Sequence, residues 1–247
     1  MRLTVLGAGP AYSDREGSSG ACYLVTDGAT NLLLDLGQGS FPRIFAHLPP
    51  PDLDAIVISH LHPDHFIDLV PLRHYLRYEF SPPRRMRVLG PSALGSRLDL
   101  LHADPRFTSG ALDASTLGTM THRVGSLEVR GALVQHTDES YAIRVAAGSG
   151  PGLVYSGDCG RAADIAALVQ PGDVLLAEAS FGPGPVAPGA QHLDGPAVGR
   201  LATTTRAGRV LLTHLQMGFD PEETVESARA AFAGDVTMVW PGTILEL

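Results

Sequence analysis

The sequence predicts an α+β protein in which groups of short strands alternate with helices. Strand-type runs rich in Val, Leu, Thr and Tyr fill the first third of the chain and are separated by Gly, Asp and Asn. Later segments place apolar residues at helical spacing between further apolar runs. Two of the apolar runs, AIVIS and VLL, are closely followed by a histidine, at His60 and His214. This loose echo predicts two related halves that face each other across a site.

The expected elements follow one another along the whole chain. Strands are expected at residues 2–6, 22–26, 31–36, 55–59, 87–89, 173–178 and 210–212, with several more between 121 and 157 and a final strand pair at 236–245. Helices are expected at residues 66–80, with a kink or break at Pro71, and at 92–101, 161–169, 195–207 and 221–232. Residues 102–115 and 182–190 are expected to be loops.

Composition limits the classes of function. With 44% hydrophobic and 18% charged residues, the 247-residue chain can form a sizeable core. A net charge of −8 disfavours a protein that coats a nucleic-acid backbone. The N-terminus lacks the pattern of a signal peptide, and no window approaches the roughly 20 apolar residues of a membrane helix. We therefore expect a cytoplasmic protein with no membrane contact. The two cysteines, Cys22 and Cys159, cannot form a disulfide framework.

The segment SHLHPDH, residues 59–65, is the strongest functional motif. His60 and His62 are two residues apart in an extended segment, so their side chains point the same way and can hold one ion. Asp64 and His65 follow at once and turn towards a second position. Imidazole and carboxylate ligands suit Zn, Fe, Mn, Co or Ni, and the absence of a nearby cysteine argues against a closed structural zinc site.

Three further candidates for metal binding come directly after apolar runs. They are His136 after EVRGALVQ, Asp158 after LVYSG, and His214 after VLLT. Alone, Asp158 would be read as a turn residue. Together with the histidines it becomes a carboxylate able to bridge two metal ions.

The segments LLLDLG, SHLHPDH, QHTDES, YSGDC and LLTHL resemble, in order and approximate spacing, the five motifs of the metallo-β-lactamase superfamily. The resemblance implies one domain, residues 1–247, with an αββα sandwich of two mixed sheets. It also implies two divalent ions, zinc foremost, with Mn, Fe, Co or Ni as alternatives. Asp35 in the first motif would support the site without binding metal. The implied first-ion ligands are His60, His62 and His136, the second-ion ligands are Asp64, His65 and His214, and Asp158 bridges both.

Two more segments, AEASF and QHLDGPAVGRLA, resemble motifs of the tRNase Z-like branch. That resemblance implies that His192 contacts the scissile phosphate or protonates the leaving oxygen, that Glu178 orients His192, and that Asp64 helps to orient the attacking hydroxide. Only 22 residues separate His136 from Asp158, which leaves no room for the tRNA-binding arm found there in bacterial enzymes. The chain thus looks like the small cyclic-nucleotide phosphodiesterases of the branch, with extended tRNA binding disfavoured.

We therefore expect a dinuclear metal-dependent hydrolase, a phosphodiesterase acting on cyclic nucleotides or short RNA. Homodimers are common in the resembled branch, so a homodimer is possible here, but the sequence itself does not indicate the oligomeric state. One alternative is a carboxylic ester, thioester or lactone hydrolase of the same fold, and another is a non-enzymatic metal-dependent binding protein.

Two further features of the sequence have no assigned role in this function. Cys159, where the family usually has Thr, is expected to be a buried bystander. Five arginines either meet substrate phosphate or form a solvated, acid-paired face: Arg73, Arg77, Arg84, Arg85 and Arg87.

Overall fold

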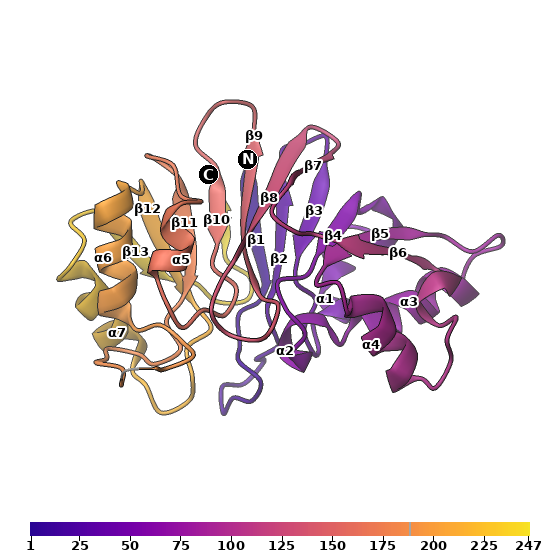
Figure 1. Cartoon of the computed structure of the whole chain (residues 1–247), viewed down its shortest axis with the longest axis horizontal. Helices are drawn as coiled ribbons and strands as arrows, with labels where there is room; N and C mark the ends of the chain where they lie inside the picture. The colour runs from indigo at the N-terminus through magenta and orange to yellow at the C-terminus, as the bar shows by residue number, and fades with distance from the viewer. Residues whose placement is uncertain (188) are drawn as a thin grey trace.

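The protein is described by a computed structural model that covers residues 1–187 and 189–247. In these residues the strands form two seven-stranded sheets that pack face to face (Figure 1). The first sheet has the order β14-β1-β2-β3-β4-β5-β6. Its strands are β14 (Ile244–Glu246), β1 (Arg2–Gly7), β2 (Cys22–Thr26), β3 (Asn31–Leu34), β4 (Ala55–Val57), β5 (Met86–Gly90) and β6 (Leu112–Thr116).

The second sheet has the order β13-β12-β11-β10-β9-β8-β7. Its strands are β13 (Asp235–Met238), β12 (Arg209–Thr213), β11 (Val174–Glu178), β10 (Leu153–Tyr155), β9 (Tyr141–Ala147), β8 (Leu127–Leu133) and β7 (Thr121–Val124). Strands β10 and β11 are buried throughout, as expected for central parallel strands whose two faces are both covered.

The two sheets share one pattern of strand directions. In the first, pairing is antiparallel from β14 to β3 and parallel from β3 to β6. In the second, it is antiparallel from β7 to β10 and parallel from β10 to β13. The two related halves predicted from the sequence are therefore visible in the topology. The equivalent of β4 is β11, however, so the histidines that follow β4 and β12 do not occupy equivalent positions.

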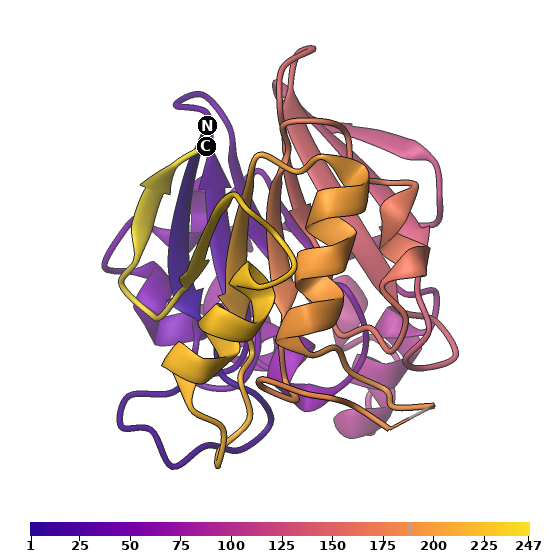
Figure 2. The ribbon, with the colours of Figure 1, turned by 90° about the vertical axis from the view of Figure 1, so that its left-hand side faces the viewer.

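Helices cover the outer face of each sheet (Figures 1 and 2). Those on the first sheet are α1 (Phe41–Ile44), α2 (Pro63–Phe66), α3 (Leu69–Tyr78) and α4 (Leu94–Leu101), with short 3-10 turns at Pro50–Asp52 and Thr108–Gly110. Those on the second sheet are α5 (Ala163–Ala166), α6 (Gly195–Thr205) and α7 (Pro221–Arg229). No helix in the described ranges combines the length and the apolar character needed to cross a bilayer.

Three apolar layers follow from this arrangement. The middle layer joins the inner faces of the sheets, with residues such as Tyr23, Leu32, Ile143 and Leu211. One outer layer lies under α1–α4 and the other under α5–α7. The expected αββα sandwich is confirmed.

Two local expectations were wrong. The helix expected over 66–80 is interrupted at Ile67 and Asp68, and Pro71 lies in the first turn of α3, where a missing N–H removes no intrahelical hydrogen bond. Residues 102–115, expected to be a loop, contribute most of β6, which pairs in parallel with β5. Only Leu112 of β6 is buried, so the strand carries little apolar pattern. The expected loop at 182–190 includes position 188, which lies outside the described residues.

Candidate metal centre

The seven predicted metal ligands converge at one end of the two sheets. His60 follows β4, Asp158 follows β10 and His214 follows β12, while Asp64 and His65 lie on α2. Their nitrogen and oxygen atoms form two groups, each with all atoms within 4.8 Å of one another, and Asp158 belongs to both. The first group is His60, His62, His136 and Asp158; the second is Asp64, His65, Asp158 and His214.

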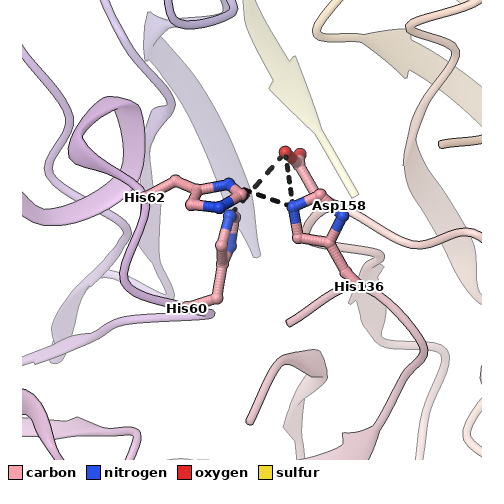
Figure 3. A group of neighbouring side chains, drawn as sticks. All are labelled: His60, His62, His136 and Asp158. Atoms are coloured by element: carbon pink, nitrogen blue, oxygen red, sulfur yellow. Dashed lines mark hydrogen bonds and ion pairs between the residues drawn. The ribbon is translucent and has the colours of Figure 1, made fainter. Parts of the chain in front are cut away.

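The first group points its ring nitrogens at a common point (Figure 3). Nδ1 of His62 lies 3.1 Å from Nε2 of His136. Oδ2 of Asp158 lies 3.7 Å from Nε2 of His60 and 3.6 Å from Nε2 of His136. Each of these distances leaves the space between the atoms that a shared cation needs.

The second group is arranged around the other carboxylate oxygen of Asp158. Oδ1 lies 3.4 Å from Nε2 of His65 and 3.6 Å from Nε2 of His214. Oδ2 of Asp64 lies 3.6 Å and 3.3 Å from the same two nitrogens. The two oxygens of the Asp158 carboxylate thus face one group each.

Unpaired atoms at the centre fit metal ions. Nε2 of His60 and Oδ1 of Asp158 are fully buried and have no hydrogen-bond partner in the described residues. Buried polar atoms normally have a hydrogen-bond partner, so two buried atoms without one at this centre indicate another kind of partner, such as a bound cation. Every ion pair of Asp158 within the described part of the chain is with a histidine, so its charge is balanced by protons or by a cation.

The electrostatics keep several of these ligands in their metal-binding forms, with His65 as the exception. Although burial opposes it, Asp158 and Asp35 raise the pKa of His65 well above its usual value, so this ring must lose a proton to bind a metal ion. Burial lowers the pKa of His60 well below its usual value and also lowers the pKa of His62. Both rings are therefore neutral and can offer a nitrogen lone pair to a metal ion. Burial opposes ionisation of Asp158, but His214 and His65 outweigh it and hold the pKa of that carboxyl well below its usual value. The pKa of Asp64 is lowered in the same way, with the hydrogen bond from His214 overcoming the effect of burial.

Asp35 supports the centre from the first sheet, through contacts with the segment SHLHPDH that carries four of the predicted ligands. Its carboxylate accepts hydrogen bonds from the Ser59 N–H at 2.6 Å, from the Ser59 hydroxyl at 2.7 Å and from the Tyr155 hydroxyl at 2.7 Å. Nδ1 of His65 donates to Oδ2 of Asp35 at 2.7 Å, which leaves Nε2 of His65 facing the centre. Asp35 belongs to neither ligand group.

Glu178, the last residue of β11, supports the centre from the second sheet. Its Oε1 accepts from the Cys159 N–H at 2.7 Å, and Oε2 accepts from the Ser180 hydroxyl. That hydroxyl also lies 3.0 Å from Nδ1 of His214. Glu178 is therefore connected to a predicted metal ligand through one serine.

His192 lies beside the metal-binding groups and is held by Glu178. Nδ1 of His192 is 3.1 Å from Oε1 and 3.2 Å from Oε2 of Glu178, and 3.8 Å from Oδ2 of Asp158. Although burial opposes it, the hydrogen bond that His192 donates to Glu178 raises the pKa of His192 to about 9. Asp194 caps α6 by accepting from the Ala197 N–H at 2.8 Å, which fixes the chain just after His192.

The centre opens into a hollow of about 300 Å³, called the site hollow below. It is lined by the buried Asp64 and Asp158 and the half-buried His192, and also by Pro10, the exposed Tyr12 and Gln216. None of the five arginines singled out in the sequence lines the site hollow. Arg73 donates to the Phe107 carbonyl and Arg85 pairs with Asp113, so these two are engaged within the protein.

Cys159 is buried beside the centre but outside both ligand groups. Burial raises the pKa of its thiol to about 12, so it is not a thiolate at neutral pH. Sequence reasoning did not assign roles to Ser59, Ser180 or Tyr155. Ser59 opens the SHLHPDH motif and Ser180 lies within AEASF, so the motifs contained both residues without indicating what they touch.

Two face-to-face mixed sheets with outer helices and a His/Asp cluster at the strand ends define the metallo-β-lactamase class of fold. Residues 30–215 match the family model described as a beta-lactamase superfamily domain, and the chain belongs to this superfamily of metallo-hydrolases.

Similar proteins support this assignment. An uncharacterised protein of Mycobacterium leprae is 31% identical over 255 residues, covering 100% of this chain and 89% of its own length. The probable metallo-hydrolase YhfI of Bacillus subtilis is 26% identical over 261 residues and covers both chains fully. Its crystal structure has a TM-score of 0.88 at 24% identity over 99% of each chain. The crystal structure of the short form of human tRNase Z has a TM-score of 0.75 at 19% identity, over 100% of this chain and 99% of that one.

Proposed function

We propose that this protein is a dinuclear metal-dependent phosphodiesterase that acts on cyclic nucleotides or short RNA. The observation that carries the proposal is the Glu178–His192 pair beside Asp158. A phosphodiester releases an alkoxide, which needs a proton, as a carboxylic ester or lactone also does, whereas a thioester releases a thiolate that needs none. A carboxylate-held imidazole at the edge of the metal-binding groups suits the first kind of leaving group. The Glu178–His192 pair therefore argues against the thioester alternative, and the substrate panel below separates the others.

In this proposal His60, His62 and His136 hold one ion, Asp64, His65 and His214 hold the other, and Asp158 contacts both. Zinc is the proposed ion, and Mn, Fe, Co and Ni tolerate the same ligands. When bound, two such metal ions would lower the pKa of water and stabilise negative charge on phosphoryl oxygens. The metal-binding role of these seven residues is a prediction that their geometry supports.

The chain's own residues supply orientation and proton transfer. Asp64 lines the site hollow, where its carboxylate can accept a hydrogen bond from the attacking water and so orient it. Glu178 holds Nδ1 of His192, so Nε2 is the nitrogen free to deliver a proton to the leaving oxygen. Burial of His60, His65 and Asp158 keeps bulk water away from the reacting groups.

The size of the site supports a small substrate. Between His136 and Asp158 the chain forms only β9, β10 and their short connections, so no arm projects there. A second hollow of about 710 Å³ adjoins the site hollow through His62 and Pro63 and has an apolar wall that includes Leu61 and Phe66. Together the two hollows can take a nucleotide or a short oligonucleotide. The cytoplasmic location expected from the sequence stays a prediction, and the oligomeric state stays open.

A substrate panel with metal analysis tests the proposal. The panel contains 3′,5′-cyclic nucleotides, a short single-stranded RNA, a thioester and a lactone, each assayed with protein of measured metal content. Turnover of a phosphodiester that chelation abolishes and metal restores supports it. Turnover of thioester or lactone alone would replace it with the ester-hydrolase alternative, and metal binding without any turnover would favour a non-enzymatic binding protein.

A further inference from the structure

Tyr12 presents a free aromatic ring at the mouth of the site hollow. Its side chain is 68% exposed, which is unusual for so large a ring. Nine large apolar side chains are exposed among the described residues, and Tyr12 is the one that also lines the hollow containing Asp64, Asp158 and His192. Isolated exposed apolar residues are common, so the location of this ring is the informative feature.

The backbone around Tyr12 is fixed on both sides. Nε2 of Gln38 lies 3.3 Å from each of the Pro10 and Ala11 carbonyl oxygens. On the other side, the guanidinium of Arg15 donates to the carbonyls of Leu215 at 3.0 Å and Phe219 at 3.2 Å. Arg15 thereby ties the Tyr12 loop to the segment that follows His214.

The ring itself makes no hydrogen bond and no aromatic contact with any other described residue. The backbone of this loop is already held in place, and its aromatic side chain has no partner. Binding a flat ligand against the ring therefore requires little further ordering of the loop and loses little conformational entropy there. No arginine lines the site hollow in the ranges that the structure describes, so no guanidinium is available in this hollow to stack against a base.

We infer that Tyr12 is a stacking platform for the nucleobase of the substrate. The inference rests on the proposed phosphodiesterase function and narrows its substrate to diesters that carry an aromatic base. Every base has a π-face, and stacking on an exposed aromatic side chain contributes affinity without selecting one base strongly. With the phosphate at the metal-binding groups, the base lies against the Tyr12 ring at the rim of the same hollow.

The test compares two substrates that differ only in the base. One is a 3′,5′-cyclic nucleotide, and the other is the 3′,5′-cyclic phosphate of methyl riboside, which has the same diester and no base. The ratio of kcat/KM for the two substrates is measured in wild-type protein and in the variants Tyr12→Ala, Tyr12→Leu and Tyr12→Phe. Tyr78→Ala is the matched control, since Tyr78 is 67% exposed on α3 and does not line the site hollow.

The expected result is a ratio that falls about 5- to 100-fold in Tyr12→Ala and Tyr12→Leu, mainly through KM for the nucleotide, and stays within about twofold in Tyr12→Phe. An unchanged ratio in Tyr12→Ala overturns the inference. So does an equal loss in Tyr12→Phe, because it would assign the effect to the hydroxyl. Wild-type protein that is inactive on both cyclic diesters and on short single-stranded RNA would instead refute the proposed function, so the two failures are distinguishable.

Discussion

Oδ2 of Asp35 lies 2.7 Å from Nδ1 of His65, and both residues are fully buried. The second half of the molecule has a comparable arrangement, in which the Ser180 hydroxyl bonds to Glu178 and lies 3.0 Å from Nδ1 of His214. In each half a buried carboxylate, directly or through a serine, fixes one predicted metal ligand so that its Nε2 faces the centre. The two halves thus support the site by similar carboxylate–histidine arrangements, although Asp35 follows β3 and Glu178 ends β11, which are not equivalent strands of the two sheets.

Replacing Asp35 by Asn should weaken metal binding without removing a ligand. The amide cannot accept all four hydrogen bonds that the carboxylate accepts, so His65 loses its fixed orientation. Loss of such a supporting partner typically costs roughly 10- to 100-fold in metal affinity. Competition with a fluorescent chelator measures it, and exposed Asp52→Asn is the matched control. Wild-type affinity in a folded Asp35→Asn protein would show that the carboxylate does not support the centre.

Replacing His192 by Ala should separate metal binding from turnover. His192 belongs to neither of the two groups that share Asp158, and its own close group with Glu178 and His214 is proposed to serve proton transfer, so metal content should match that of wild type. Loss of a positioned general acid should lower kcat by roughly 10²- to 10⁴-fold on a 3′,5′-cyclic nucleotide, whose leaving group is an alkoxide that needs a proton. The exposed His47→Ala variant is the control. Unchanged turnover in His192→Ala would remove the general-acid role.

Asp173 should stabilise the fold above about pH 4 and lose that effect in acid. Burial opposes its ionisation, but the Arg144 hydrogen bonds at 2.7 and 2.9 Å and the Gly152 N–H hold the pKa of this carboxyl below its usual value. A lowered folded-state pKa means that the stabilisation is present above the unfolded-state pKa and is lost as pH falls through the folded-state pKa. The Asp173→Asn protein should therefore be less stable by about 3 kcal/mol at pH 7, because it leaves Arg144 unpaired.

Urea unfolding of the chelated protein at pH 7 and at pH 3 measures this effect without interference from metal release. Asp113→Asn, which breaks an exposed pair with Arg85, is the control and should cost no more than about 1 kcal/mol. The difference between wild type and Asp173→Asn should shrink at the lower pH. A difference that is the same at both pH values would show that ionisation of Asp173 does not contribute.

The sequence predicted much of the site because its groups follow strands whose ends meet. SHLHPDH, His136, Asp158 and His214 are brought together as the motif order implied, although their binding of metal is still a prediction. The supporting contacts could not be predicted, since Ser180 meets His214 across 34 residues and Tyr155 meets Asp35 across 120. Strand β6 was missed for a related reason: its polar residues pair with β5 through the backbone, and only the fold creates that partner.

Metal content of the purified protein tests the central claim most directly. Two ligand groups that share Asp158 predict about two divalent ions per chain by mass spectrometry of the metals. His62→Ala removes one ligand of the first group and should lower that content towards one while abolishing turnover. A wild-type content of one ion or none after saturation with zinc or manganese, or a His62→Ala protein with the full wild-type content, would contradict the account.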